Sequence, residues 1–378
     1  MKRLLFCLSF IIFHISFSIA QNDDIEVTDS TSNNWGGGSG GELNIQKPIL
    51  SLSLNDGWNW VSHPLKNSVA VSTILGEDGY RVLSQTKEMI NDDAYGWVGN
   101  LSELVAGQCY KVQMTGQKTV TLPIDELCTE AISLRKGWNW VGYNYNFSAS
   151  LSHALQNNFS EEGDIIFGKG STAIFFGGQW IGDIESIIPG QGYMYKSVSN
   201  KMLVYNNEKE VINSSQYNHT LHTQENNPIF TVDNSKYSSQ MSVIGKLYSG
   251  NEPLLPWTVG AFCGDVCRGV SNVVSGLLFI SIGGEIGDII TFRTIDNDGV
   301  IREIKEELNF DGDMHGSPLS PVALHVNYDQ TGIETSVVHT SIIDKTYDLN
   351  GRRIRDEKGL HSHPVRIVNK KKVVSATY

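Results

Sequence analysis

Residues 57–61 read GWNWV, and residues 137–141 read GWNWV again. Tryptophan is a rare residue, so two identical pentapeptides with two tryptophans each, 80 residues apart (137 − 57), indicate an internal repeat. The repeat allows two interpretations. Either a ligand-binding motif occurs twice, or the core of a small domain occurs twice.

The repeat extends well beyond the pentapeptide. Trp97 begins the stretch WVGNLSELVAGQCY, and Trp180 begins WIGDIESIIPGQGY. The two stretches lie 83 residues apart (180 − 97), which predicts an insertion of three residues in a connecting loop of the second copy. We therefore expect two small α+β modules in tandem, at 47–127 and 128–205.

Each module contains signals for short strands and little helix. Asp56-Gly57 is a typical hairpin turn between SLSL and the GWNWV strand. SVAVSTILG (68–76) and ASLSHALQN (149–157) predict a short helix. NLSELVAGQ (100–108) and DIESIIPGQ (183–191) predict a helical turn that Gly107 or Gly190 closes in a left-handed conformation. The remaining segments predict strands.

The first twenty residues, MKRLLFCLSFIIFHISFSIA, have the pattern of a secretory signal peptide with cleavage after Ala20. The alternative, a membrane anchor, requires a longer apolar stretch than the one that His14 and Ser16 interrupt. No later segment is long and apolar enough to cross a bilayer. The sequence therefore predicts an exported chain without a transmembrane segment after cleavage, followed by a disordered leader at 21–46.

Composition narrows the classes of partner. Removal of the signal peptide leaves 27 basic and 41 acidic side chains, a net charge of −14. A strongly acidic exported protein is a poor candidate for binding nucleic acid. The low charged fraction of 19% and the many Gly, Asn, Ser and Thr residues favour a mainly β fold with many turns.

The second half of the chain changes character. Residues 206–227 and 328–345 are polar and predict linkers. Between them, 228–327 contain seven short apolar runs separated by turn residues, which predicts an immunoglobulin-like β-sandwich. From residue 345 on, the tail carries nine basic side chains against three acidic ones.

Three stretches together resemble secreted, multi-modular proteins of the Bacteroidetes. The GWNW module with its PGQGY ending resembles a repeat of such proteins, and GAFCGDVCRGV (260–270) resembles the signature of their β-sandwich. The tail, with YDLNGRRI and IVNKKKVV, resembles the C-terminal sorting domain of the type IX secretion system. This resemblance implies export through that machinery by the tail at 346–378, and a secreted or outer-surface location. It names no enzymatic activity.

The tryptophans are the candidate ligand platform. Trp58 and Trp60 are two residues apart and lie on one face of a strand, as do Trp138 and Trp140. Exposed, such pairs form a flat surface for stacking sugar rings, and buried, they form a core. The complete candidate set is Trp58, Trp60, Trp97, Trp138, Trp140 and Trp180.

Four cysteines follow the signal peptide. Cys263 and Cys267 flank a short turn, and Cys109 and Cys128 flank a hairpin. An even number in an oxidising compartment favours two disulfides, Cys263–Cys267 and Cys109–Cys128. Zinc is the alternative for the first pair, but no second pair of ligands stands at suitable spacing.

Catalytic motifs are missing from the sequence. It contains no HExxH and no G-x-S-x-G in a suitable context, since GGSGG (37–41) lies in the glycine-rich leader, and the Asp-Gly stretches at 296–299 and 311–313 do not match an EF-hand. We therefore expect no cofactor, no metal and no enzymatic activity. The expected function is adhesion or ligand binding to an extracellular glycan or protein. The alternatives are carbohydrate binding on tryptophan platforms and, with less support, a small extracellular hydrolase.

Overall fold

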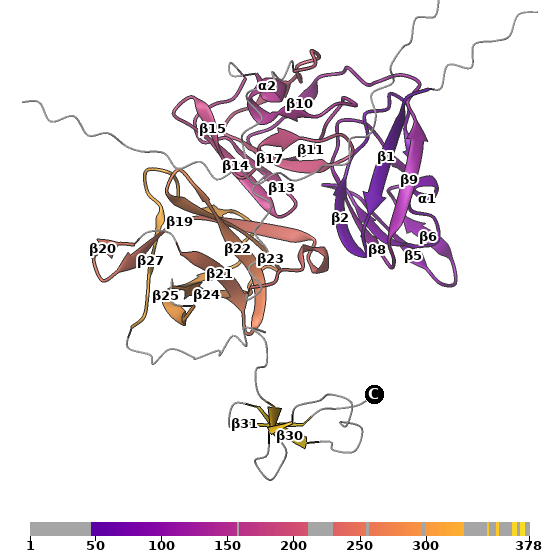
Figure 1. Cartoon of the computed structure of the whole chain (residues 1–378). Coiled ribbons are helices and arrows are strands. Elements are labelled where there is room, and N and C mark those ends of the chain that lie inside the picture. Colours follow the sequence, from indigo (N-terminus) through magenta and orange to yellow (C-terminus); the bar gives the residue numbers. More distant parts are fainter. Residues whose placement is uncertain are drawn as a thin grey trace, which may run out of the picture. The chain divides into compact units, whose positions relative to one another are not determined.

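The computed structural model describes residues 47–156, 159–210, 230–254, 257–296 and 299–328, and the backbone of four short strands beyond them (Figure 1). The predicted signal peptide and leader lie outside the described residues. Strands dominate the described chain, and its two α-helices have five residues each. The mainly β prediction is confirmed.

The first copy of the repeat alternates strands with one short helix. Its elements are β1 (Ile49–Leu54), β2 (Gly57–Val61), β3 (Val69–Ala70), α1 (Val71–Leu75), β4 (Gly79–Leu83), β5 (Glu88–Asp92), β6 (Gly96–Gly99), β7 (Glu103–Leu104), β8 (Tyr110–Met114) and β9 (Lys118–Pro123).

The second copy has the same elements in the same order. They are β10 (Ile132–Leu134), β11 (Gly137–Gly142), β12 (Ala149–Ser150), α2 (Leu151–Leu155), β13 (Ile165–Gly168), β14 (Ser171–Phe176), β15 (Gln179–Gly182), β16 (Ser186–Ile187), β17 (Gly192–Ser197) and β18 (Lys201–Leu203).

Strand pairing is also the same in both copies. The five-stranded sheets have the orders β2-β8-β4-β5-β6 and β11-β17-β13-β14-β15. Each copy adds two ribbons, β1-β9 and β3-β7 in the first, and β10-β18 and β12-β16 in the second. A shared topology with shared motifs shows that the two copies are one module repeated. We call them module 1 and module 2.

The register locates the length difference between the copies. Val82 pairs with Val112, and Ile166 pairs with Tyr195 at the matching position, an offset of 84 (166 − 82). The offset is 80 at the helices (151 − 71) and 83 at the Trp97 and Trp180 positions. Module 2 therefore gains four residues between helix and sheet and loses one in the β14–β15 turn. The predicted single insertion of three residues is the sum of these two changes.

Two local predictions are wrong. Asp56-Gly57 does not close a hairpin, because β1 pairs with β9 while β2 pairs with β8. The predicted helical turns contain the extended pairs β7 and β16 instead. The left-handed glycines within them are confirmed, since Gly107 and Gly190 have φ of +75° and +83°. The predicted short helices correspond to α1 and α2.

The GWNWV strands use their two faces differently. Val61 belongs to the core of module 1 and Val141 to the core of module 2. The tryptophans point to the opposite face, because successive side chains alternate across a strand. Trp60 belongs to a separate cluster outside both module cores. The repeated tryptophans are therefore not the centre of either module.

The third region contains the strands β19 (Ser239–Ser249), β20 (Glu252–Pro253), β21 (Thr258–Cys263), β22 (Val266–Val274), β23 (Leu277–Gly284), β24 (Ile289–Ile295), β25 (Ile301–Asn309), β26 (Met314–His315) and β27 (Val322–His325), preceded by the 3-10 helix η1 (Asn234–Lys236). Six of the seven predicted strands are confirmed. The seven apolar runs are 230–233, 241–248, 258–265, 277–284, 289–296, 300–310 and 321–326. The first run, FTVD, is not a strand, and β22 lies outside all seven.

Strand β22 joins two layers in this region. Its first half pairs with β21 and its second half with β23. The sheet thereby folds over one apolar core, which includes Val243, Phe292 and Leu324. An isolated bridge between Ile304 and Val326 links β25 to the end of β27. We refer to this region by its predicted name, the β-sandwich, and both the sandwich architecture and its immunoglobulin-like class stay predictions.

The tail contributes four short strands whose backbone is described. They are β28 (Thr346–Tyr347), β29 (Arg353–Ile354), β30 (Val365–Val368) and β31 (Lys371–Val374), in the order β29-β28-β30-β31. Within the described residues, no helix has the length and apolar character needed to span a bilayer.

Candidate functional site

The glycine and the asparagine of GWNWV build the turn that starts the strand. Gly57 and Gly137 have φ of +80° and +97°, a conformation that favours glycine. The Asn59 side chain accepts a hydrogen bond from the Asn55 N–H at 2.9 Å and donates to the carbonyl oxygens of Asn55 and Gly57. Asn139 makes the equivalent bonds in module 2. These two motif positions are structural.

The GQxY motif also has a structural role, because its tyrosine holds a turn by hydrogen bonds. The Tyr110 hydroxyl accepts a hydrogen bond from the Val105 N–H at 2.8 Å and donates to Gln108 Oε1 at 3.2 Å. Tyr193 repeats both bonds one module later. The motif therefore fixes the turn that precedes β8 and β17, and it needs no ligand to explain it.

The modules contact each other reciprocally. Val61 forms a β-bridge with Gln191, and Val141 forms the equivalent bridge with Gln108. The β4–β5 turn of module 1 reaches module 2 through Gln85, which donates to the carbonyl oxygen of Trp138 at 2.8 Å. Lys169, at the matching position of module 2, donates to the carbonyl oxygen of Trp58. These pairs describe an approximate two-fold axis between the modules, as in an isologous dimer.

Positions near this axis face their own counterparts. Cys109 of module 1 corresponds to Gly192 of module 2, and a Cβ on Gly192 would overlap the Cys109 sulfur. Ser62 corresponds to Gly142, where a Cβ would lie 2.8 Å from the Ser62 Cβ and 2.7 Å from the Gln108 carbonyl oxygen. Since equivalent side chains meet at the axis, one member of each pair has to be glycine.

An apolar cluster joins all three regions, and we call it the junction cluster. Its buried members are Trp60, Cys109, Ile165, Phe167, Ile174, Ile244 and Phe279, with Trp138, Trp140 and Met194 partly buried against them. Trp60 is 5% exposed, and its indole N–H donates to the Ser238 carbonyl oxygen at 3.2 Å. Each such ring removes about 150–250 Å² from water, so the junction contributes strongly to stability.

Lys111 lies between the modules without a carboxylate partner among the described residues. It is 4% exposed, and its ammonium lies 4.8 Å from the Trp60 ring centroid and 4.5 Å from that of Trp140. Burial lowers the pKa of Lys111 to about 8. The two aromatic faces offset part of the cost of burying this charge.

Polar bonds hold module 2 to the β-sandwich. Lys196 forms a bidentate ion pair with Asp313 at 2.5 and 2.6 Å. Gln240 bridges the two regions by accepting from the Gly170 N–H and donating to the Ser171 carbonyl oxygen. Asp183 accepts from Asn272 at 2.8 Å, and burial raises the pKa of this carboxyl group.

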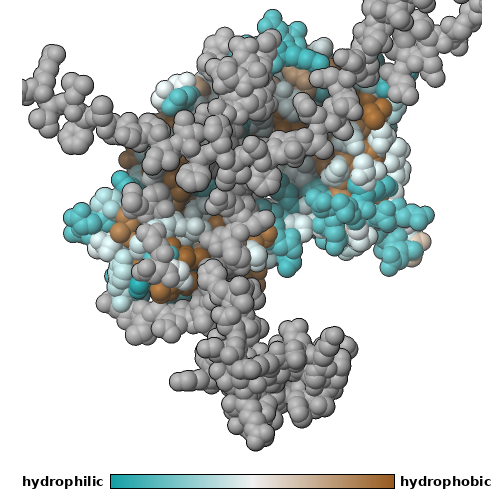
Figure 2. Space-filling model, in the orientation of Figure 1, coloured by the Kyte–Doolittle hydropathy of each residue, from teal (hydrophilic) through white to brown (hydrophobic). Residues whose placement is uncertain are grey.

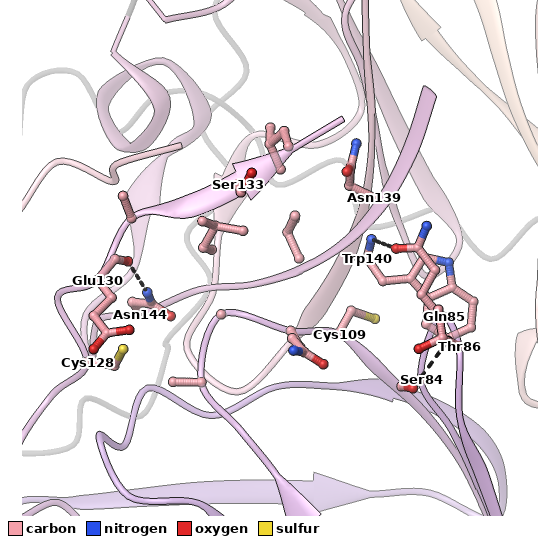
Figure 3. A pocket seen from close by; sticks show the side chains of 17 residues that line it. Ser84, Gln85, Thr86, Cys109, Cys128, Glu130, Ser133, Asn139, Trp140 and Asn144 are labelled. Atoms are coloured by element: carbon pink, nitrogen blue, oxygen red, sulfur yellow. Dashed lines mark hydrogen bonds between the residues drawn. The ribbon is translucent and has the colours of Figure 1, made fainter. Parts of the chain in front are cut away.

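A cleft of about 400 Å³ opens where the two modules meet, and Figure 3 shows its lining. Trp140 and Gln85 stand on one side, with Glu130, Asn144 and Cys128 on the other. Three residues of the lining are buried, namely Cys109, Asn139 and Asn144. Asn144 is 3% exposed, and its Oδ1 has no hydrogen-bond partner within the described chain. An unmet buried acceptor costs about 1–3 kcal/mol, so this atom marks a place for a donor.

The six predicted platform tryptophans divide into three groups. Trp97 and Trp180 pack against the cores of their own modules, and Trp60, Trp138 and Trp140 belong to the junction cluster. Trp58 is half-buried and belongs to none of the apolar clusters of the described residues. Trp140 alone among the six also lines the cleft.

The predicted disulfides are absent, because the four cysteines of the described chain are free thiols. Cys263 faces Val266 across the β21–β22 hairpin, so Cys267 lies one residue out of register. Cys263 consequently packs against the sandwich core, and Cys267 packs on the other side of the strands with Phe262. Cys109 and Cys128 occupy separate positions in the cleft lining (Figure 3).

Lys111, Asn144 and Gln85 are site residues that no sequence motif indicates. Lys111 occurs where module 2 has Met194, and a lysine on a strand normally indicates the solvent face. Asn144 corresponds to Pro64 of module 1, so the repeat pattern carries no signal for it either. Lys111, Asn144 and Gln85 become site residues only because the other module lies against them.

The described residues contain no group of three or more His, Cys, Asp or Glu side chains placed to hold a metal ion. No family model, curated protein or solved structure matches the chain.

Proposed function

We propose that this chain is an exported, non-enzymatic protein for adhesion or ligand binding, in which the junction cluster makes the two modules and the β-sandwich one rigid support. The observation that carries the proposal is the cleft between the modules, which is lined by Trp140, Glu130 and Asn144, whose enclosed Oδ1 has no hydrogen-bond partner within the described chain. Preformed clefts with a few convergent polar groups are the usual form of ligand sites.

The chemistry of the lining favours binding over catalysis. Trp140 offers a ring for stacking, and Asn144, Ser133 and Glu130 offer hydrogen-bonding groups. The lining contains two thiols, Cys109 and Cys128, and burial raises the pKa of the Cys109 thiol to about 12. A thiol with that pKa stays protonated at neutral pH and is a weak nucleophile.

The export part of the proposal rests on the predicted signal peptide and on the tail at 346–378, which would act through the secretion machinery. A chain that ends at residue 345 should accumulate inside the cell, while the full chain reaches the medium or the outer surface. Fractionation and immunoblotting of the producing bacterium would check this. Equal export of both chains would refute a sorting role for the tail.

The binding part is tested with the whole mature chain, residues 21–378. A fragment of modules 1 and 2 alone would expose the junction cluster, whose apolar side chains would bind other proteins non-specifically. We expect saturable binding of the mature chain to an immobilised panel of extracellular glycans and matrix proteins. The proposal would be abandoned if the folded chain bound no member of either panel.

Carbohydrate binding on a tryptophan platform is the second candidate, and one observation favours it at one position. Trp58 stays outside the apolar clusters, and its cross-strand neighbours Gln113 and Arg81 form a row of planar polar side chains beside it. A Trp58→Ala variant should lose glycan binding with little loss of stability if this platform is the site.

A further inference from the structure

We infer that the cleft between the modules takes a neutral, hydroxyl-rich ligand, the terminal sugar of a glycan. This inference rests on the proposed binding function and adds the chemical class of the ligand. It departs from the tryptophan platforms expected from sequence, because the site is a cleft formed by both modules.

The need for a donor in the ligand comes from Asn144. Its Nδ2 donates to the Glu130 carbonyl oxygen at 3.4 Å, which fixes the orientation of the amide. Its Oδ1 is left without a partner in a residue that is 3% exposed. A ligand hydroxyl group that displaces the atoms now enclosing this oxygen would satisfy it, and the exposed Glu130 carboxylate at the rim accepts a second hydroxyl group.

The apolar part of the ligand site is Trp140. Its backbone N–H donates to Gln85 Oε1 at 3.0 Å, which ties the residue to module 1. Lys111 already covers one face of the ring and is not part of the cleft lining. Trp140 is partly buried against the junction cluster, and the part that lines the cleft lies beside hydrogen-bonding groups, a combination that suits the apolar face and hydroxyl edge of a sugar ring.

Charge excludes an anionic ligand and gives no advantage to a cationic one. The lining contains no lysine, arginine or histidine, and it contains Glu130, so a phosphate or carboxylate group would meet repulsion without a counter-charge. An ammonium group would be attracted by Glu130 and repelled by Lys111, whose Nζ lies 4.5 Å from the Trp140 ring centroid, and these two effects oppose each other. A neutral ligand needs no counter-charge.

The repeat supplies a matched pair of variants. Ser133 lines the cleft and is exposed on β10, and Ser53 is the exposed serine at the same position of β1 in module 1. Ser133→Trp places a large ring in the cleft, while Ser53→Trp places the same ring on a surface outside it. Both positions face solvent, so we expect both variants to fold.

The probe is an array of neutral, acidic and amino-sugar glycans, followed by calorimetric titration of the strongest binder into the mature chain. We expect a neutral glycan to bind, with a loss of about tenfold or more for Ser133→Trp, about tenfold for Asn144→Ala, and less than about twofold for Ser53→Trp. Glu130→Gln should change affinity by less than about threefold without a new salt dependence.

Several outcomes would overturn the inference. If Ser133→Trp binds the glycan like the native chain while Trp58→Ala does not, the sugar lies on the Trp58 face. A large loss in Glu130→Gln, with strong salt dependence, would identify a cationic ligand. Binding to matrix proteins but to no glycan would refute the sugar ligand and leave the proposed binding function intact. Binding to neither panel would refute both the sugar ligand and the binding function.

Discussion

Modules 1 and 2 share one topology, but the outer faces of their sheets have different environments. One row of cross-strand neighbours runs across each face at equivalent positions. The row is Trp58, Gln113, Arg81, Ile90 and Val98 in module 1, and Trp138, Lys196, Ile165, Ile174 and Ile181 in module 2. Three positions of the module 2 row are isoleucine, where module 1 has arginine, isoleucine and valine.

This difference decides which of the two rows packs against the β-sandwich. In module 2 the row lies against Ile244 and Phe279 of the sandwich. In module 1, Ile90 and Val98 are 37% and 49% exposed, and Arg81 pairs with Glu88. Figure 2 shows hydrophilic residues gathered over β5 and β6. Both modules therefore form the same sheet, and a few side chains on the outer face of each sheet determine what packs against that face.

The largest expected effect comes from a charge placed at equivalent isoleucines. Ile174→Lys should destabilise the chain by about 4 kcal/mol, because the ammonium would be buried in the junction cluster without a partner. Ile90→Lys should cost less than about 0.5 kcal/mol, since that side chain already faces water. Urea unfolding followed by tryptophan fluorescence would measure both. Equal costs would refute the proposed asymmetry.

The next largest effect on stability concerns Cys109 and Gly192, which meet at the axis between the modules. Gly192→Cys should cost about 3 kcal/mol, because the new Cβ overlaps the Cys109 sulfur. Cys109→Gly should cost about 1–2 kcal/mol through the cavity it leaves. The double variant exchanges the two residues between modules and should cost at least about 1 kcal/mol less than the sum. Strict additivity of the unfolding free energies would show that the two positions do not meet.

The smallest effect tests Lys111 against its counterpart Met194. The folded pKa of Lys111 is about 8, below the ordinary 10.5, so the unfolded chain holds a proton between these pH values that the folded chain releases. The contribution of Lys111 to stability is therefore most unfavourable below pH 8 and improves as the pH rises to about 10.5. Lys111→Met should be more stable than the native chain by about 2 kcal/mol at pH 7.

That advantage should shrink by about 2 kcal/mol between pH 7 and pH 10, because the native lysine becomes neutral. Cys109 titrates near pH 12 in the folded state and is common to both proteins, so its contribution cancels in the comparison. Chemical denaturation of both proteins at the two pH values would check the difference. A constant difference would mean that Lys111 keeps an ordinary pKa.

Local sequence signals predicted the elements well where one module contains all the determinants. The GWNWV strands, the helices at 71–75 and 151–155, and the left-handed Gly107 and Gly190 follow from periodicity and turn chemistry. The hairpin predicted at Asp56-Gly57 failed because β1 finds its partner in β9, more than 60 residues later. The Cys263–Cys267 disulfide failed because one residue of register separates two cysteines that are close in sequence.

Repeat spacing and residue type alone indicated that a module occurs twice, where its GWNWV strands and short helices lie, and that Gly107 and Gly190 are left-handed. These properties depend on residues within one module, where spacing and side-chain type suffice. The tertiary structure decided the roles of the tryptophans, of Lys111 and of Asn144. Burial of a strand's outer face is set by what packs against it, and in this chain that is the other module and the β-sandwich. The repeated GWNWV is thus a motif for joining modules, and the candidate ligand site is the cleft that their joining forms.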